Sequence, residues 1–225
     1  MNAEHLLTLI HLLLFCYWLG GDIGVFYSSG FVVDGNRNRD ERLMAAKIML
    51  TLDLVPRICM SVMLTVGGLL SAAIGIDHPL WQLVGIVLLG PVWLTMVLLQ
   101  HYRHGASWMP ALVRIDRLLR WAVIVAIVAS VTYSFSTGRL ADTPWLGGKL
   151  LGFAWLVFCG LMIRRHFGGY GAGYASLLQG EPTAQENVAM QASMARMRPW
   201  VLCIWAVLIV EAWLGVAQPS FGLAP

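Results

Sequence analysis

Residues 6–27 read LLTLIHLLLFCYWLGGDIGVFY, an apolar run that decides the fold class. The run exceeds the roughly 20 residues that an α-helix needs to cross the hydrocarbon core of a bilayer. His11 and Asp22 are its only acidic or basic side chains, so the helix has no polar face to turn toward water. The run therefore predicts a transmembrane helix. Residues 1–5 lack a basic residue and a small-residue cleavage site, so we expect this span to be retained.

The whole chain has the composition of a membrane protein. Of its 225 residues, 58% are hydrophobic and 12% are charged, whereas a soluble domain is about 25% charged. The net charge of +3 is too small to suggest a nucleic-acid partner. We expect an all-α, polytopic transmembrane helical bundle of about six spans, forming one integral membrane domain over residues 1–225. The other five predicted spans are 45–74, 80–100, 118–135, 145–163 and 200–216.

Basic residues alternate between the connections, and this pattern predicts the orientation of the spans. Lys and Arg are concentrated after the first, third and fifth spans, whereas Arg139 alone lies in the remaining connections. Because cytoplasmic loops carry the excess of Lys and Arg, we expect both termini to be periplasmic in a bacterial inner membrane. The residues counted are Arg37, Arg39, Arg42, Lys47, Arg103, Arg114, Arg117, Arg120, Arg164, Arg165, Arg196 and Arg198.

Two of the longest connections have sequences from which we predict a local structure. Residues 101–117 are basic and aromatic and are expected to lie along the membrane interface. The glycine-rich segment 168–173 follows a predicted helix rather than a strand, which indicates a flexible loop and not a phosphate site. Three methionines that precede the last span share one helical face, and this spacing favours a buried helix face over a copper site; they are Met190, Met194 and Met197.

The cysteines are isolated from one another. Each lies within an apolar stretch and none forms a CxxC pair, so we expect small buried thiols, with neither a disulfide nor a zinc site. They are Cys16, Cys59, Cys159 and Cys203.

Six ionisable residues lie deeper within the predicted spans than Lys47 and Arg120, which are counted above with the connections. Each costs roughly 2.5–3.5 kcal/mol or more at membrane depth, so each is a candidate functional residue. The predicted topology places three toward the outer side and three toward the cytoplasm. The outer residues are His11, Lys149 and Glu211, and the inner residues are Asp22, Asp53 and Arg57.

Helical spacing sorts these residues onto faces. His11, Trp18 and Asp22 share one stripe of the first span. Asp53 and Arg57 are four residues apart, so they can pair, and Asp22 can complete a charge cluster that locks the first two spans together. The alternatives are structural: His11 can hydrogen-bond a neighbouring helix, the Asp53–Arg57 pair can simply neutralise itself, and Lys149 and Glu211 can extend to the outer interface.

A histidine inside a helical bundle, with aromatic residues nearby, is what a b-type haem requires of its protein. His11 is the histidine well inside a span, so one haem is favoured, with His11 as metal ligand and Lys149 as second ligand or propionate partner. A bis-histidine site would need one of the histidines at span ends, which are His5, His78 and His101; His104 lies in a loop.

Three motifs resemble a superfamily of bacterial haem-binding membrane proteins that includes the copper resistance protein D-like family and the HemJ-type protoporphyrinogen oxidases. They are His11 with WLGG at 18–21, the second span from Lys47 through DLVPR at 53–57 to Gly67-Gly68, and PWLGGKL at 144–150. The resemblance covers less than half of the chain. It implies a helical bundle that binds haem b, with His11 as ligand and Lys149 nearby; the candidate cofactor-binding residues are His11, Lys149, Arg57 and Trp18.

We therefore expect an inner-membrane haem b redox protein that passes electrons between a partner subunit and the quinone pool. Two alternatives remain open. One is a HemJ-type oxidase acting on a porphyrinogen, and the other is a non-haem transporter or channel for copper or protons. In the last case His11, Lys149 and Glu211 would form a relay.

Overall fold

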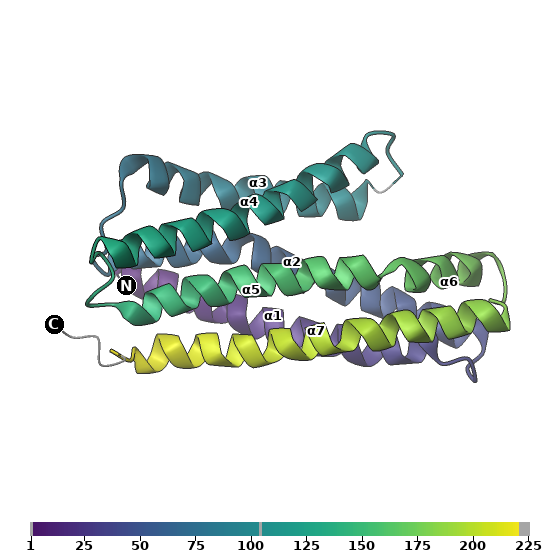
Figure 1. Ribbon diagram of the computed structural model, residues 1–225. Coiled ribbons are helices and arrows are strands. Elements are labelled where there is room, and N and C mark those ends of the chain that lie inside the picture. The colour runs from purple at the N-terminus through teal and green to yellow at the C-terminus, as the bar shows by residue number, and fades with distance from the viewer. Residues whose placement is uncertain (1, 104, 221–225) are drawn as a thin grey trace. The chain divides into compact units, whose positions relative to one another are not determined.

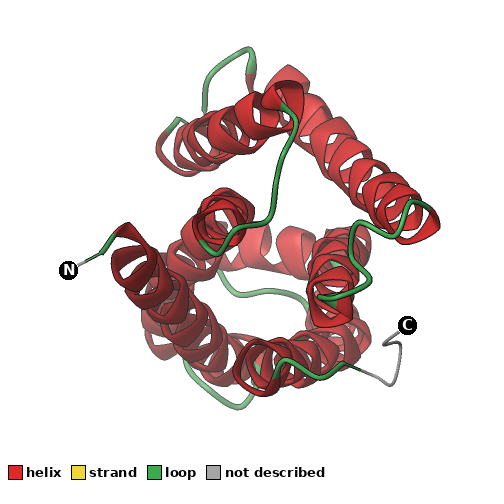
Figure 2. Ribbon diagram, turned by 90° about the vertical axis from the view of Figure 1, so that its left-hand side faces the viewer, coloured by secondary structure: helices red, strands yellow, loops and turns green. Residues whose placement is uncertain are grey.

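The computed structural model describes residues 2–103 and 105–220, and helices are the regular secondary structure of this part (Figures 1 and 2). Every helix except α6 is long and apolar enough to cross a membrane. The prediction of an all-α polytopic bundle with six spans is therefore confirmed. His104 lies outside the described residues. The helices are α1 (Ala3–Val33), α2 (Arg39–Ala73), α3 (Leu80–Tyr102), α4 (Met109–Ser136), α5 (Pro144–His166), α6 (Gly168–Gln179) and α7 (Ala184–Ala217).

Several helices extend well beyond the predicted spans. The helix α7 has 34 residues, about 51 Å at 1.5 Å per residue, whereas the hydrocarbon core is about 30 Å thick. Its first half, with α6, replaces the long connection expected over 164–199. The helix α4 begins at Met109, so much of the expected interfacial segment 101–117 is helical too. The predicted spans ended at charged residues because the apolar run ends there. A helix can continue past that point into water, so the observed helices are longer than the spans.

Contacts divide the chain into two compact units. The first unit comprises Met1–Tyr27 and Lys47–Asp116, and the second comprises Ser28–Ala46 and Arg117–Pro225. The helices α1 and α2 therefore contribute their longer parts to the first unit and their mutually adjacent ends to the second.

In the first unit, close packing of α1 on α2 depends on small residues. A methyl group at Gly21 would lie 2.8 Å from the ring of Pro56, the proline inside α2. Thr65 then ties α2 to α3, because its hydroxyl donates to the Ile86 carbonyl and accepts from the Gly90 amide. A threonine that bonds across helices satisfies a backbone group where water is absent.

In the second unit, α5 and α6 both pack along α7, and α6 continues beyond the end of α5 in Figure 1. The expectation of a flexible loop over residues 168–173 is wrong, because this segment is the first half of α6. Gly169 faces the Ala189 carbonyl, which a methyl group there would approach to 2.8 Å, and Gly173 faces Met190. Glycines four residues apart let two helix backbones approach closely, so these glycines serve packing.

The first turn of α7 is fixed by a capping box. The Thr183 hydroxyl accepts from the Glu186 amide, and the Glu186 carboxylate accepts from the Thr183 amide in return. Hydrogen bonds from Ser176 and Thr183 lower the pKa of Glu186 below its ordinary value of 4.5. The methionine stripe of α7 is buried, as predicted: Met190, Met194 and Met197.

Two arginines from the start of α2 fasten the part of the second unit that projects beyond the spans. Arg42 is fully buried and donates to the Val32 carbonyl and to the side chain of Asn187 on α7. Arg39 donates to the carbonyls of Leu177 and Leu178 at the end of α6, where cations stabilise a helix terminus. Arg39 and Arg42 therefore connect the start of α2 to α6 and α7, in addition to their part in the unequal distribution of basic residues among the connections.

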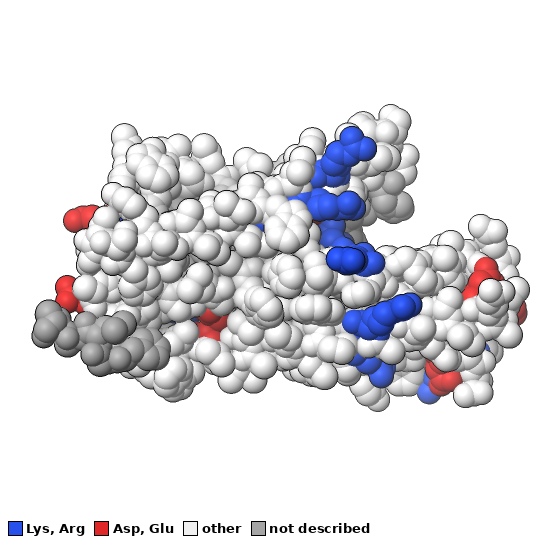
Figure 3. Space-filling view, in the orientation of Figure 1, with Lys and Arg blue, Asp and Glu red and all other residues white. Residues whose placement is uncertain are grey.

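Other basic residues mark the end of the apolar part of the second unit. Figure 3 shows Lys and Arg gathered over the end of α5 and the neighbouring part of α7. The last turn of α5 contains Arg164, Arg165 and His166.

The cysteines are free thiols, but their expected burial is only partly correct. Cys59 and Cys159 are buried, Cys203 is half-buried, and Cys16 is exposed. A thiol exposed at membrane depth can face lipid, so an apolar environment did not require a buried position.

Candidate functional site: charged and nitrogen-donor residues within the spans

His11 projects from α1 toward α2 within the first unit. A methyl group at Gly67 would lie 3.1 Å from Cε1 of the imidazole and 3.7 Å from Nδ1. Glycine at this position lets the ring lie close to the α2 backbone, since a methyl group there would require the ring to shift by a few tenths of an ångström. The sequence placed His11 inside a span, and the structure adds that α2 provides the surface that orients it.

Trp18 and Asp22 follow His11 on α1. Trp18 is buried, as a residue on an inward-facing stripe should be. Asp22 is largely buried on α1 and lies within electrostatic range of Asp53 on α2. Asp53 in turn forms the predicted ion pair with Arg57 one turn later on α2. The structure thus brings Asp22, Asp53 and Arg57 together in the first unit.

The other candidate histidines lie near helix ends. His5 is exposed in the first turns of α1. His78 follows α2, and its Nε2 lies 2.8 Å from the Ser71 hydroxyl. His101 is in the last turn of α3, where its ring contacts Tyr102 edge to face.

Lys149 and Glu211 meet in the second unit, apart from the charge cluster of the first. The ammonium of Lys149, on α5, donates to the backbone carbonyl of Glu211 at 2.8 Å and lies 3.6 Å from its carboxylate. The two side chains are 19% and 13% exposed. At membrane depth this pairing is favourable, because an isolated charge would lack water. The two residues therefore pair with each other across α5 and α7, which neither the relay nor the interface alternative specified.

Glycines on both helices make this pairing possible. A Cβ at Gly152 of α5 would overlap the Glu211 carboxylate, and a Cβ at Gly215 of α7 would lie 3.2 Å from Nζ of Lys149. Each charged side chain thus occupies the space left by a glycine on the opposite helix. Sequence reasoning missed Gly152 and Gly215, although the four-residue spacing of Gly148 and Gly152 was a signal for a closely packed face.

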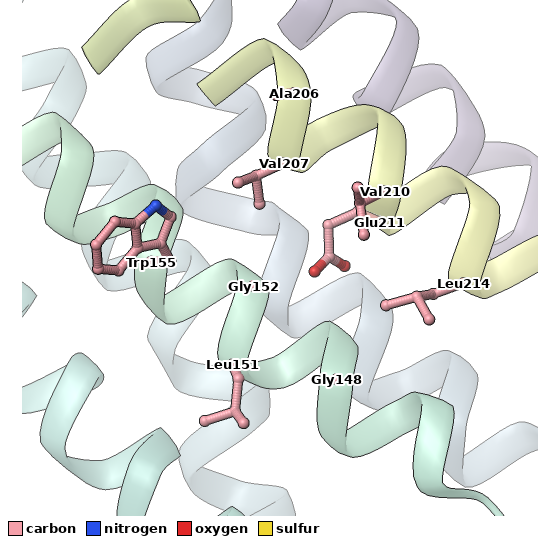
Figure 4. A pocket seen from close by; sticks show the side chains of 9 residues that line it. All are labelled: Gly148, Leu151, Gly152, Trp155, Ala206, Val207, Val210, Glu211 and Leu214. Carbon is pink, nitrogen blue, oxygen red and sulfur yellow. The ribbon is translucent and has the colours of Figure 1, made fainter. Parts of the chain in front are cut away.

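A groove of about 380 Å³ lies between α5 and α7 at this pair. Its α5 wall is formed by Gly148, Leu151, Gly152 and Trp155, and its α7 wall includes Val207, Val210 and Glu211. Figure 4 shows the Glu211 carboxylate pointing from α7 toward α5, and the Trp155 indole farther along α5. The groove is therefore apolar except at Glu211.

The Trp155 indole is held at this groove by neighbours from its own unit. Its N–H donates to the Cys203 sulfur of α7 at 3.2 Å, and its ring packs against Phe158, with centroids 5.3 Å apart. Since the hydrogen bond and the ring contact fix two edges of the indole, its position is well defined.

The nitrogen donors decide what could hold a cofactor. Within the described residues, no three His, Cys, Asp or Glu side chains converge as a metal-ion site would require. A haem needs only axial donors, and the oriented imidazole of His11 suits that role. Lys149 is engaged with Glu211 as a hydrogen-bond donor, and Arg57 is paired with Asp53, so the fit to haem depends on His11.

Comparisons with known proteins add no assignment. No family model, curated protein or solved structure matches the chain.

Proposed function

We propose that this protein is a b-type haem-binding redox protein of a bacterial inner membrane, with one haem and His11 as an axial ligand. The observation that carries the proposal is the position of the His11 imidazole, which lies over Gly67 inside the first unit. The stripe that continues from His11 to the buried Trp18 offers an apolar, aromatic wall beside it. The resemblance of these motifs to haem-binding membrane proteins supports the same reading.

The chain's own residues would have distinct roles. A bound haem supplies one-electron redox chemistry, and His11 supplies the nitrogen donor that positions it. Asp22, Asp53 and Arg57 form the charged part of the first unit. Along α1, Asp22 lies about 16 Å from His11 at 1.5 Å per residue. Lys149, engaged with Glu211, has no place in this ligand set.

The basic connections support an orientation with both termini in the periplasm. His11 would then lie near the periplasmic side, where a redox partner can deliver or accept electrons. The quinone pool in the lipid would be the second redox partner.

The absorption spectrum of the purified protein tests the proposal. The parent protein should show a reducible b-type spectrum, and folded His11→Ala should lack it. Gly67→Ala should shift or broaden the spectrum, because its methyl group crowds the imidazole. Gly85→Ala on α3 is the matched control, since a methyl group there meets nothing within 4 Å. A spectrum that survives His11→Ala unchanged would reject His11 as the ligand.

A second candidate function is a proton or ion pathway without haem. The Lys149–Glu211 pair favours it, because paired ionisable groups within spans are typical of such pathways. A colourless parent protein, prepared with haem supplied during expression, would select this candidate. If the protein is coloured, oxidation of protoporphyrinogen by the purified protein would instead identify a HemJ-type oxidase.

A further inference from the structure

The groove between α5 and α7 combines features that the haem proposal does not use. Its outer wall is made of apolar side chains that remain exposed, among them Leu151, Trp155 and Val210. At the depth of the spans such side chains face lipid rather than water. An occupant would therefore enter from the bilayer, which selects a lipid-soluble molecule.

The volume and polarity of the groove further limit which lipid-soluble molecules could occupy it. About 380 Å³ is within the roughly 300–1,000 Å³ of small-molecule sites, and it is too small for a partner helix about 10 Å across. A lipid acyl chain would offer no donor to the Glu211 carboxylate, whose acceptor sites beyond the Lys149 ion pair would then face hydrocarbon, which is costly. A flat ring that carries a hydroxyl group would donate to that carboxylate and stack on the indole of Trp155.

We propose that the groove formed by Gly148, Gly152, Trp155 and Glu211 binds the head group of a lipid-soluble quinol. A quinol hydroxyl donates a hydrogen bond to the Glu211 carboxylate, which is the charged group of the groove. The indole of Trp155, held by Cys203, gives the ring a fixed aromatic face. Gly148 and Gly152 leave the floor open, because a side chain at either position would enter the space between the helices.

This inference deepens the proposed function, since it assigns a site to the quinone that the redox proposal requires. It remains testable apart from haem, because the groove belongs to the second unit and His11 to the first. His11→Ala should therefore bind quinol as the parent does.

Photoaffinity labelling with a short-chain azido-ubiquinol, competed by decylubiquinol under anaerobic conditions, measures binding to the purified full-length protein. The label should map to peptides of α5 and α7, and excess decylubiquinol should displace it. Glu211→Gln keeps the shape of the side chain but removes its charge, so the apparent affinity should fall about 10-fold, as expected for a lost charge-assisted hydrogen bond. Trp155→Leu should also weaken binding, and Trp155→Phe should restore most of it.

Glycine variants on α5 supply a matched pair. Gly152→Ala places a methyl group where the Glu211 carboxylate lies, and this flexible side chain must move away. Affinity should fall by about as much as in Glu211→Gln. Gly160→Ala adds the same methyl group two turns along α5, 3.8 Å from Arg120 and outside the groove, and should change affinity less than about 2-fold.

The results separate the two proposals. Displaceable labelling of α5 and α7 that falls in Glu211→Gln and Gly152→Ala supports the quinone site, even if the protein proves colourless and the haem proposal fails. Labelling that decylubiquinol cannot displace, that maps to other helices, or that is unchanged in Glu211→Gln overturns the quinone site, even if haem is bound. A groove filled by an acyl chain would produce the first of these negative results.

Discussion

Each charged residue inside the spans is accommodated by a specific neighbour. Arg57 has Asp53 one turn away, and Lys149 has Glu211 on another helix. Asp22 differs, because its electrostatic neighbour Asp53 carries the same charge. The cluster therefore has two carboxylates, on Asp22 and Asp53, and one guanidinium, on Arg57. Loss of Asp22 should affect stability differently from loss of Asp53 or Arg57.

This asymmetry predicts different effects for the three residues. Asp53→Ala and Arg57→Ala should each destabilise the fold by about 3–5 kcal/mol, because the surviving charge is left uncompensated. This magnitude assumes that the partly exposed side chains of the pair lie in the hydrocarbon at their predicted depth, where water does not screen the loss. Asp22→Asn should fold as well as the parent or better, since it removes a repulsion. Folded yield and Tm in detergent measure these effects, and normal yields of Asp53→Ala and Arg57→Ala would show that the pair is solvated.

At the scale of elements, α6 exists as a helix because α7 lies beside it. Five glycines in residues 168–180 give this segment little helix propensity of its own. The close approach of Gly169 and Gly173 to α7 supplies packing contacts that offset this deficit. The stability of α6 therefore depends on two particular glycines and not on glycine content.

A pair of variants separates packing from propensity. Gly169→Ala should detach α6, because its methyl group would meet the rigid Ala189 carbonyl, whereas Gly168→Ala meets nothing within 4 Å and should be neutral or stabilising. Hydrogen exchange of the amides in 168–179 measures the difference, with protection expected to fall about 10-fold or more in Gly169→Ala. Equal protection in both variants would mean that α6 does not need this contact.

At the scale of the whole molecule, the arrangement of basic residues predicts how the chain is inserted. Reporter fusions after Asp77 and Pro225 should be active only as periplasmic reporters, and a fusion after Ser107 only as a cytoplasmic one. Arg39 and Arg42 make structural hydrogen bonds, so Arg103, Arg114 and Arg165 are the better residues to replace when orientation is tested. A cytoplasmic signal at Pro225 would contradict the predicted topology.

Much of the candidate chemistry was available from local spacing. Hydropathy located all six spans, because each apolar run is long enough to cross a bilayer. The four-residue separation of Asp53 and Arg57 predicted their ion pair, since residues one turn apart share a helix face. The same periodicity predicted the buried face that contains Met190, Met194 and Met197.

The sequence by itself thus determined the class of the protein, its spans and its local pairs, since these depend on composition and on periodicity within one helix. Only the tertiary structure decided that Lys149 pairs with Glu211, that Gly67 accommodates His11, and that residues 168–173 are helical. These outcomes depend on residues far apart in the chain, where a missing Cβ on one helix creates room for a side chain of another. Such complementarity has no period along the sequence, because it arises only when two helices pack in a particular register.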